Sequence, residues 1–130
     1  MKENVPSKTV EKPAYAIVIH GGAGYIQANN FSDENKEKYL NALDTALTIG
    51  ETILKDGGSS IEAVEKTINY MENNPLFNAG KGAVFTHDGQ NEMDASIMYG
   101  KDQNAGAVGG VRTVKNPISL ARKVMEESDH

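Results

Sequence analysis

The sequence of 130 residues contains no cysteine and no tryptophan, and positive charge is scarce. Without cysteine there is no disulfide framework, no thiolate nucleophile and no cysteine-ligated zinc. The 13 lysine and arginine side chains are outnumbered by 18 acidic ones, and arginine occurs only at Arg112 and Arg122. Since nucleic-acid recognition depends on a surplus of basic side chains, we expect no nucleic-acid partner. No apolar run approaches the roughly 18 residues that a membrane span needs, so we expect no membrane partner either.

The N-terminal residues mix lysine with glutamate and contain no apolar stretch of the kind that a signal peptide requires. We predict a flexible arm over residues 1–14 and a single, incomplete domain over residues 15–130. We expect a cytoplasmic protein, although a periplasmic or secreted location stays open if an upstream signal was removed.

The first predicted elements of the domain are a strand and a helix. The apolar run from Tyr15 to His20 has the length of a strand and stops at Gly21-Gly22-Ala23-Gly24. From residue 36 to residue 55, apolar side chains recur at steps of three and four residues. With Ser32 or Asp33 as its cap, this segment is predicted to be an amphipathic helix.

Local motifs then predict two more helices and a β-meander. Ser59 followed by Glu62 has the form of a capping box, Asp88-Gly89 is a hairpin signal, and Asn116-Pro117 is typical of an N-cap followed by proline in the first helical turn. The expected order is a strand at 15–20, helices at 36–55 and 59–73, strands at 82–86, 93–99 and 105–113, and a helix from 117.

Three of these strands are apolar at consecutive positions, which is typical of strands covered on both faces. Three helices can cover one face of a four-stranded sheet, but 130 residues leave nothing to form a second layer. We therefore expect either a partner that covers the other face or an incomplete domain.

The glycines that follow His20 form the first candidate functional site. Glycine can adopt positive φ and leaves its amide hydrogen accessible to a bound group. The stretch matches neither a dinucleotide fingerprint nor a P-loop, and the nucleophile elbow that accompanies a lipase-type His-Gly-Gly loop is missing. A tight turn needed only for packing, with His20 as a structural histidine, stays open.

The segment from Asn74 to Gly82 is the second candidate, because it follows the end of a helix. The last carbonyls of a helix lack intrahelical partners, and a loop that turns its own carbonyls inward can complete an all-oxygen cation site. An ordinary asparagine- and glycine-rich connection is the competing interpretation.

A third group consists of His87, Asp88, Glu92 and Asp94. Glu92 and Asp94 share one strand face, so a metal site is conceivable. We favour an exposed turn for His87 and Asp88 and an anchor for backbone amides for Asp94.

Five stretches of the sequence, taken together in their order, carry a resemblance that runs from about Tyr15 to the end of the chain. They are Tyr15 to Gly24, Asn74 to Thr86, Glu92 to Met98, Ala105 to Val108 and Asn116 to Ile118. Their order and spacing resemble those of the plant-type L-asparaginase and isoaspartyl aminopeptidase family.

The resemblance implies an N-terminal-nucleophile hydrolase with an α/β (α+β) fold in four layers, two stacked sheets between helical layers. This chain would supply about one sheet and three helices. In that family the precursor cleaves itself before a threonine, and the freed threonine hydrolyses L-asparagine or isoaspartyl dipeptides through an acyl-enzyme. The implied partners are a beta subunit that carries the threonine, a second copy of the pair in an (αβ)2 assembly, and a small-molecule substrate.

By matching positions, the resemblance assigns His20, Gly21 and Gly22 to a loop that borders the active site and Asn78 to a position near the nucleophile. It implies no organic cofactor but a structural sodium ion. The main-chain carbonyls expected to hold this ion belong to Met71, Glu72, Asn74, Phe77, Ala79 and Lys81.

The sequence departs from the family at the cleavage site, because no glycine in it is followed by threonine. The catalytic nucleophile is therefore absent, and we expect an alpha-subunit portion that is inactive alone. A non-catalytic fragment that binds a partner stays open as an alternative. A glycosylasparaginase-type amidase also stays open, although the His20-Gly21-Gly22 loop argues against it.

Overall fold

The computed structural model describes residues 13–23 and 32–128. The predicted arm over residues 1–14 therefore lies outside the described residues except for its last two, and so do Gly24 and the last two residues of the chain.

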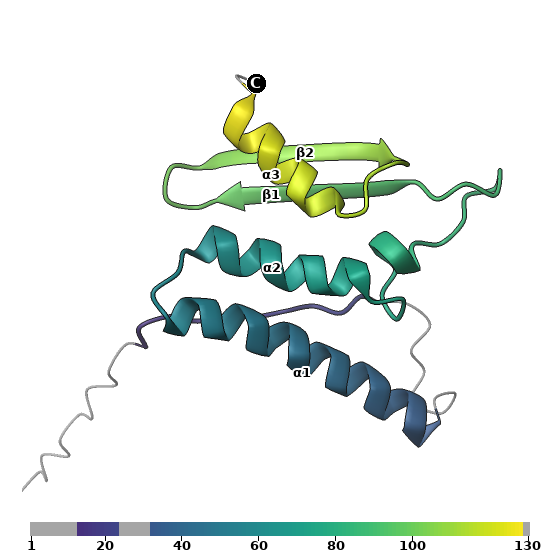
Figure 1. The fold of residues 1–130 in the computed structure, drawn as a ribbon, viewed down its shortest axis with the longest axis horizontal. Coiled ribbons are helices and arrows are strands. Elements are labelled where there is room, and N and C mark those ends of the chain that lie inside the picture. The colour runs from purple at the N-terminus through teal and green to yellow at the C-terminus, as the bar shows by residue number, and fades with distance from the viewer. Residues whose placement is uncertain (1–12, 24–31, 129–130) are drawn as a thin grey trace, which may run out of the picture.

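The described elements are three helices, one short 3-10 helix and a two-stranded sheet. Figure 1 shows α1 and α2 side by side, the β-hairpin beyond α2, and α3 lying across the hairpin. The mixed helix-and-sheet class is thus confirmed, and no helix of the described part is long and apolar enough to cross a membrane. In chain order the elements are α1 (Asp33–Lys55), α2 (Ser60–Asn73), η2 (Gly80–Gly82), β1 (Met93–Tyr99), β2 (Asn104–Val111) and α3 (Pro117–Glu127).

Side-chain caps set the N-termini of α1 and α2, as their sequences predict. The Ser32 hydroxyl accepts a hydrogen bond from the Asn35 amide at 3.3 Å, and the Ser59 hydroxyl accepts one from the Glu62 amide at 3.3 Å. These contacts satisfy amide groups that have no partner within the helix. Because Ser32 is the cap, α1 begins at Asp33, three residues before the predicted start.

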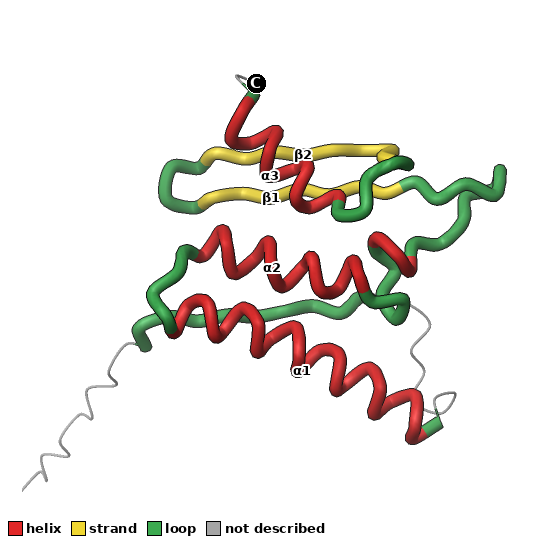
Figure 2. The backbone as a smooth tube through the Cα atoms, viewed as in Figure 1, coloured by secondary structure: helices red, strands yellow, loops and turns green. Residues whose placement is uncertain are grey.

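The segment over residues 13–23 runs along α1 and α2, as the tube in Figure 2 shows. At the closest approach, a Cβ built on Gly50 of α1 would lie 2.4 Å from Ile17 Cδ1 and 2.6 Å from Thr67 Oγ1 of α2. Because residue 50 has no side chain, α1, α2 and the segment over residues 13–23 can approach one another closely at this point.

The predicted strand over Tyr15 to His20 is extended but is not part of a sheet. Its side chains alternate between half-buried and exposed, and Val18 is 92% exposed. The prediction of burial on both faces is therefore wrong for this chain. The physical reason is that the segment has helices on one side, while none of the described residues pairs with it as a neighbouring strand.

The sheet has two antiparallel strands instead of the predicted meander. β1 pairs with β2 in a register that places Ile97 opposite Gly106. The pairing shifts between Met93 and Ala95, and there the Asp94 carboxylate accepts a hydrogen bond from the Gly110 amide at 2.7 Å. Asp94 thus anchors a backbone amide, as expected, at an irregular point of the ladder.

The strand predicted at residues 82–86 is also wrong. Residues 80–82 form η2, and the only β pairing in the described part of this region is an isolated bridge between Phe85 and Asn91. The predicted Asp88-Gly89 turn is present, since the Thr86 amide donates to the Gln90 carbonyl at 2.7 Å and Gly89 has a φ of 71°.

The core lies between α3, α2 and one face of the hairpin. Its buried members are Ile61, Ile97, Ile118, Ala121 and Met125. On the opposite face of the sheet Met98 is 62% exposed, so one face is covered and the other is open in the described residues.

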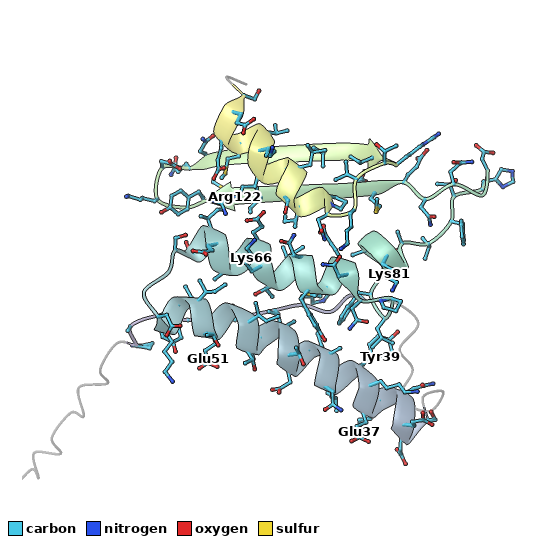
Figure 3. All side chains as sticks on the ribbon, in the orientation of Figure 1. Glu37, Tyr39, Glu51, Lys66, Lys81 and Arg122 are labelled. Atoms are coloured by element: carbon cyan, nitrogen blue, oxygen red, sulfur yellow. The ribbon has the colours of Figure 1, made fainter. Side chains whose placement is uncertain are left out.

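A partly buried polar network joins α2 to α3 beside this core. The Glu65 carboxylate accepts hydrogen bonds from Ser119 Oγ at 2.6 Å and from Arg122 Nη1 at 2.8 Å. Figure 3 shows Arg122 on α3 close to α2. Burial alone would raise the pKa of Glu65, but the hydrogen bonds from Ser119 and Arg122, together with the positive charges of Arg122 and Lys66, outweigh it and lower that pKa.

Candidate functional site

The end of α2, the loop after it and the His20 segment lie at one end of the molecule (Figure 1). His20 and Met71 line the same narrow groove of about 170 Å³ between the N-terminal segment and α2. The structure therefore brings together two stretches that are about 50 positions apart in the sequence.

The His20 segment forms a compact local turn. The Gly22 amide donates a hydrogen bond to His20 Nδ1 at 3.2 Å, and Gly22 has a φ of 108°, which side chains disfavour. A Cβ built on Gly21 would lie 2.8 Å from Leu43 Cδ2 of α1, whereas one on Gly22 would meet none of the described residues within 4 Å. Gly21 thus serves packing, and Gly22 serves backbone conformation.

Asparagine side chains shape the loop after α2. The Asn74 carbonyl Oδ1 accepts from the Leu76 amide at 3.1 Å, and Asn78 Oδ1 accepts from the Val84 amide at 3.0 Å. Asn78, predicted to lie near the nucleophile, therefore holds the chain where it leaves η2.

Asn91 was missed by the sequence analysis. Its Nδ2 donates to the carbonyl of Ala83 at 2.7 Å and to that of Val84 at 3.2 Å. Asn91 therefore ties the chain after the Asp88-Gly89 turn to the residues that follow η2. The signal that could have indicated it is an asparagine in a strand-like run after the Asp88-Gly89 turn, because strands disfavour asparagine.

Main-chain carbonyls gather around two glycines of this loop. A Cβ built on Gly80 would lie 2.3 Å from the Glu72 carbonyl oxygen, and one on Gly82 would lie 2.1 Å from the Phe77 carbonyl oxygen and 2.7 Å from that of Pro75. Any other residue at these positions would fill the space that the oxygens occupy. Gly80 also has a φ of 53°.

Four of the predicted sodium ligands already accept a backbone hydrogen bond. The amides of Asn74, Phe77, Ala79 and Gly82 donate, in that order, to the carbonyls of Met71, Asn74, Phe77 and Ala79, at 3.1, 3.3, 2.8 and 3.1 Å. Each carbonyl oxygen has a second lone pair, and oxygen is the ligand that hard cations prefer. The residues present therefore fit a small cation held by main-chain oxygens, and the sodium assignment stays a prediction.

Two side chains near the loop are buried, Phe77 within it and Glu72 at the end of α2, and Phe77 anchors the loop to α1. Phe77 is buried, and its ring meets Tyr39 of α1 edge-on with the ring centroids 6.3 Å apart. Glu72 is 3% exposed, and its carboxylate faces α3. Of the predicted ligand residues, Lys81 has an exposed side chain, which lines an open hollow of about 380 Å³ beside η2 and is labelled in Figure 3.

The third candidate group does not form a metal site. Glu92 pairs with Arg112, and Asp94 binds the Gly110 amide. Within residues 13–23 and 32–128, no three histidine, cysteine, aspartate or glutamate side chains are placed so that they could share a metal ion.

Comparison with known proteins identifies the family. The asparaginase family model matches residues 13–130. The plant-type L-asparaginase of Pyrococcus abyssi is 52% identical over 115 residues, which are 88% of this chain and 36% of that protein. The isoaspartyl peptidase/L-asparaginase of Bos taurus is 48% identical over 114 residues, 88% of this chain and 36% of its own length. The corresponding protein of Rattus norvegicus is 50% identical over 114 residues, 88% of this chain and 33% of its own length.

The chain spans about a third of the length of these relatives. Within that third, the matched region includes the turn at His20 to Gly22 and the whole carbonyl-rich loop, residues 74–82. The chain therefore belongs to the asparaginase family, among the plant-type L-asparaginases and isoaspartyl peptidases.

Proposed function

We propose that this chain is the alpha-subunit portion of an isoaspartyl peptidase/L-asparaginase. The observation that carries the proposal is the roughly 50% identity to relatives with these names over 88% of the chain. The hydrolysed bond is the side-chain amide of L-asparagine or the β-linked peptide bond of an isoaspartyl dipeptide. The nucleophile is a threonine outside these 130 residues, since no Gly-Thr pair occurs among them.

In the proposed reaction, the threonine hydroxyl attacks the amide carbon, the carbon–nitrogen bond breaks, and ammonia or the amino group of the next residue leaves. Water then hydrolyses the ester that joins the aspartyl group to the threonine. This chain contributes the scaffold on which the threonine acts. None of the described residues would crowd a side chain at Gly22, and Asn78 fixes the loop after α2.

The bound cation has a structural role in this proposal. Carbonyl oxygens of Met71, Glu72, Asn74, Phe77, Ala79 and Lys81 would hold a sodium ion, which neutralises their partial negative charges and so favours one loop conformation. Support comes from the way Gly80 and Gly82 make room for two of these oxygens, those of Glu72 and Phe77.

The open sheet face supports a larger assembly. Met98 on the open sheet face is 62% exposed, and Val84 and Phe85, in the segment before β1, are 63% and 73% exposed. Apolar surface of this kind marks an interaction site in a folded protein. We propose that a beta subunit with its own sheet covers it and completes the four-layer sandwich. Two such pairs would form the (αβ)2 assembly. We also propose that the enzyme is cytoplasmic.

The function is tested by assaying the intact protein, meaning the longer protein of which we propose these 130 residues are a part. The assays follow ammonia release from L-asparagine and aspartate release from β-aspartyl dipeptides. Activity is expected from the intact protein and from residues 1–130 co-expressed with a threonine-starting beta subunit, but not from residues 1–130 alone. Turnover by the 130 residues alone would contradict the location of the nucleophile. Absence of turnover by the intact protein would favour a non-catalytic partner-binding role, the alternative that the missing Gly-Thr pair supports.

A matched pair of variants tests the role of the His20 turn. Gly22 and Gly89 both have positive φ, 108° and 71°, and at either position an added Cβ would have no described residue within 4 Å. Alanine therefore strains the backbone at both sites by about 1–2 kcal/mol. We expect Gly22→Ala to lower kcat/KM and Gly89→Ala to leave it unchanged. Equal effects of the two substitutions on kcat/KM would contradict a role of the Gly22 turn in the active site.

A further inference from the structure

Glu72 is a buried carboxylate that the proposed reaction does not use. Its Oε1 accepts a hydrogen bond from the Ile118 amide at 2.9 Å, and its Oε2 accepts one from Asn116 Nδ2 at 2.9 Å. No lysine or arginine of the described part forms an ion pair with it. Its negative charge is therefore met by hydrogen-bond donors at the start of α3.

This arrangement replaces the N-cap that the sequence predicts for α3. Asn116 occupies the N-cap position, but its side chain makes no cap hydrogen bond and turns to Glu72 instead. The first amides of a helix lack intrahelical partners, and the helix dipole favours a negative charge beside them. The carboxylate that caps α3 thus comes from the last turn of α2, more than 40 positions earlier in the sequence.

The backbone of the same residue touches the carbonyl-rich loop. A Cβ on Gly80 would lie 2.3 Å from the Glu72 carbonyl oxygen and 2.7 Å from its Cβ. The loop therefore packs against both the backbone and the root of the Glu72 side chain. A shift of the Glu72 backbone or Cβ would therefore displace Gly80, because closely packed groups transmit strain.

We propose that Glu72 is a positioning residue that couples the first turn of α3 to the carbonyl-rich loop, so that docking of α3 and cation binding stabilise each other. This inference rests on the proposed cation site and goes beyond it by assigning the coupling to one side chain. By linkage, the cation strengthens the Glu72–Ile118 contact as much as that contact strengthens cation binding.

Glu65 offers a matched control on the same two helices. It is also a buried carboxylate of α2 that binds α3, through Ser119 and Arg122, but it lies two turns before the loop. Both Glu65→Gln and Glu72→Gln remove one buried charge at the α2–α3 contact with little change in shape. Only Glu72→Gln removes it beside the carbonyl-rich loop.

The test measures how thermal stability of the intact protein responds to sodium chloride, with choline chloride keeping the ionic strength constant. For Glu72→Gln we expect the sodium concentration that gives half of the maximal stabilisation to rise about tenfold. This lies within the range of roughly 5- to 150-fold that coupling between two sites usually spans. For Glu65→Gln we expect a lower melting temperature in both salts and an unchanged sodium response. Hydrogen exchange supplies a second readout: sodium should slow exchange of the Ile118 amide in the wild type and in Glu65→Gln, but not in Glu72→Gln.

The outcomes separate the possible failures. An equal sodium response in wild type and Glu72→Gln, or an equal loss of response in both variants, would overturn the coupling. No sodium response in the wild type would overturn the coupling and the cation site together, while the hydrolase proposal would still be decided by product release. If Glu72→Gln does not fold, Asn116→Ala, which removes one donor and keeps the carboxylate, should shift the sodium response in the same direction; an unchanged response would overturn the proposal.

Discussion

The contact between α3 and β2 at Gly106 predicts a sharp effect of one added methyl group. A Cβ built on Gly106 would lie 2.2 Å from the Ala121 carbonyl oxygen and 2.5 Å from the Met125 amide nitrogen. Both are backbone atoms of α3, so no side-chain rotation can relieve the clash. Gly106→Ala therefore forces the helix away from the sheet.

Two opposing effects determine the magnitude. Replacing glycine by alanine in a strand stabilises by about 0.5–1 kcal/mol, because the unfolded chain loses freedom. Overpacking of a core costs about 1–3 kcal/mol, and a displacement of α3 by roughly 1 Å forfeits a quarter to a half of the dispersion energy at each affected contact. Since backbone is displaced and Ile118 and Met125 are buried in this interface, we place the cost near the upper end. We expect a net loss of about 2 kcal/mol in the free energy of unfolding.

The assay is urea unfolding of the intact protein followed by circular dichroism, with Gly100→Ala as the control. Gly100 lies in the turn between β1 and β2, its φ is not positive, and an added Cβ would meet nothing. The control should be unchanged or more stable by about 0.4–1 kcal/mol. A Gly106→Ala protein as stable as the control would refute the reasoning that helix and strand backbones are in direct contact.

Three further substitutions test other parts of the fold by urea titration. Because folding lowers the pKa of Glu65, the ionised carboxylate stabilises the folded protein. This stabilisation is complete at pH values above the usual pKa of about 4.5, and it is lost as the pH falls through the lower pKa of the folded state. Glu65→Gln should therefore show a flatter loss of stability below about pH 4.5 than the wild type, and equal slopes would contradict the network. Ser59→Ala removes the cap of α2 and should cost about 1 kcal/mol; no loss would mean that the hydroxyl contributes nothing. Gly50→Ala should destabilise the protein despite a gain of about 1 kcal/mol in helix propensity. The reason is that its Cβ would lie 2.4 Å from Ile17 Cδ1 and 2.6 Å from Thr67 Oγ1. A more stable variant would show that both side chains can move aside.

The sequence by itself determined the features that depend on neighbouring residues. The caps at Ser32 and Ser59, the turn at Gly89 and the proline at the start of α3 are all present where their motifs predict them. Each of these signals acts over three or four positions, so the distant chain has little influence on it. The order of the five matching stretches was equally readable, and it indicated the family.

The tertiary structure decided which apolar segments become strands and what lies on their two faces. The run from Tyr15 to His20 has the composition of a buried strand, but a strand exists only where another strand pairs with it, and α1 and α2 are its neighbours here. Likewise, an isolated bridge at Phe85 replaces a predicted strand, because residues 80–82 form η2 and the Asn91 side chain binds the carbonyls of Ala83 and Val84.

The candidate site divides in the same way. His20, Gly22 and the residues around Asn78 could be singled out from the sequence because glycine and asparagine mark special backbone conformations. The meeting of the His20 segment with the end of α2 depends on helix packing, and so does the capping of α3 by Glu72. No local pattern encodes a carboxylate on one helix that satisfies the amides of another, because that contact exists only when α2 and α3 are docked.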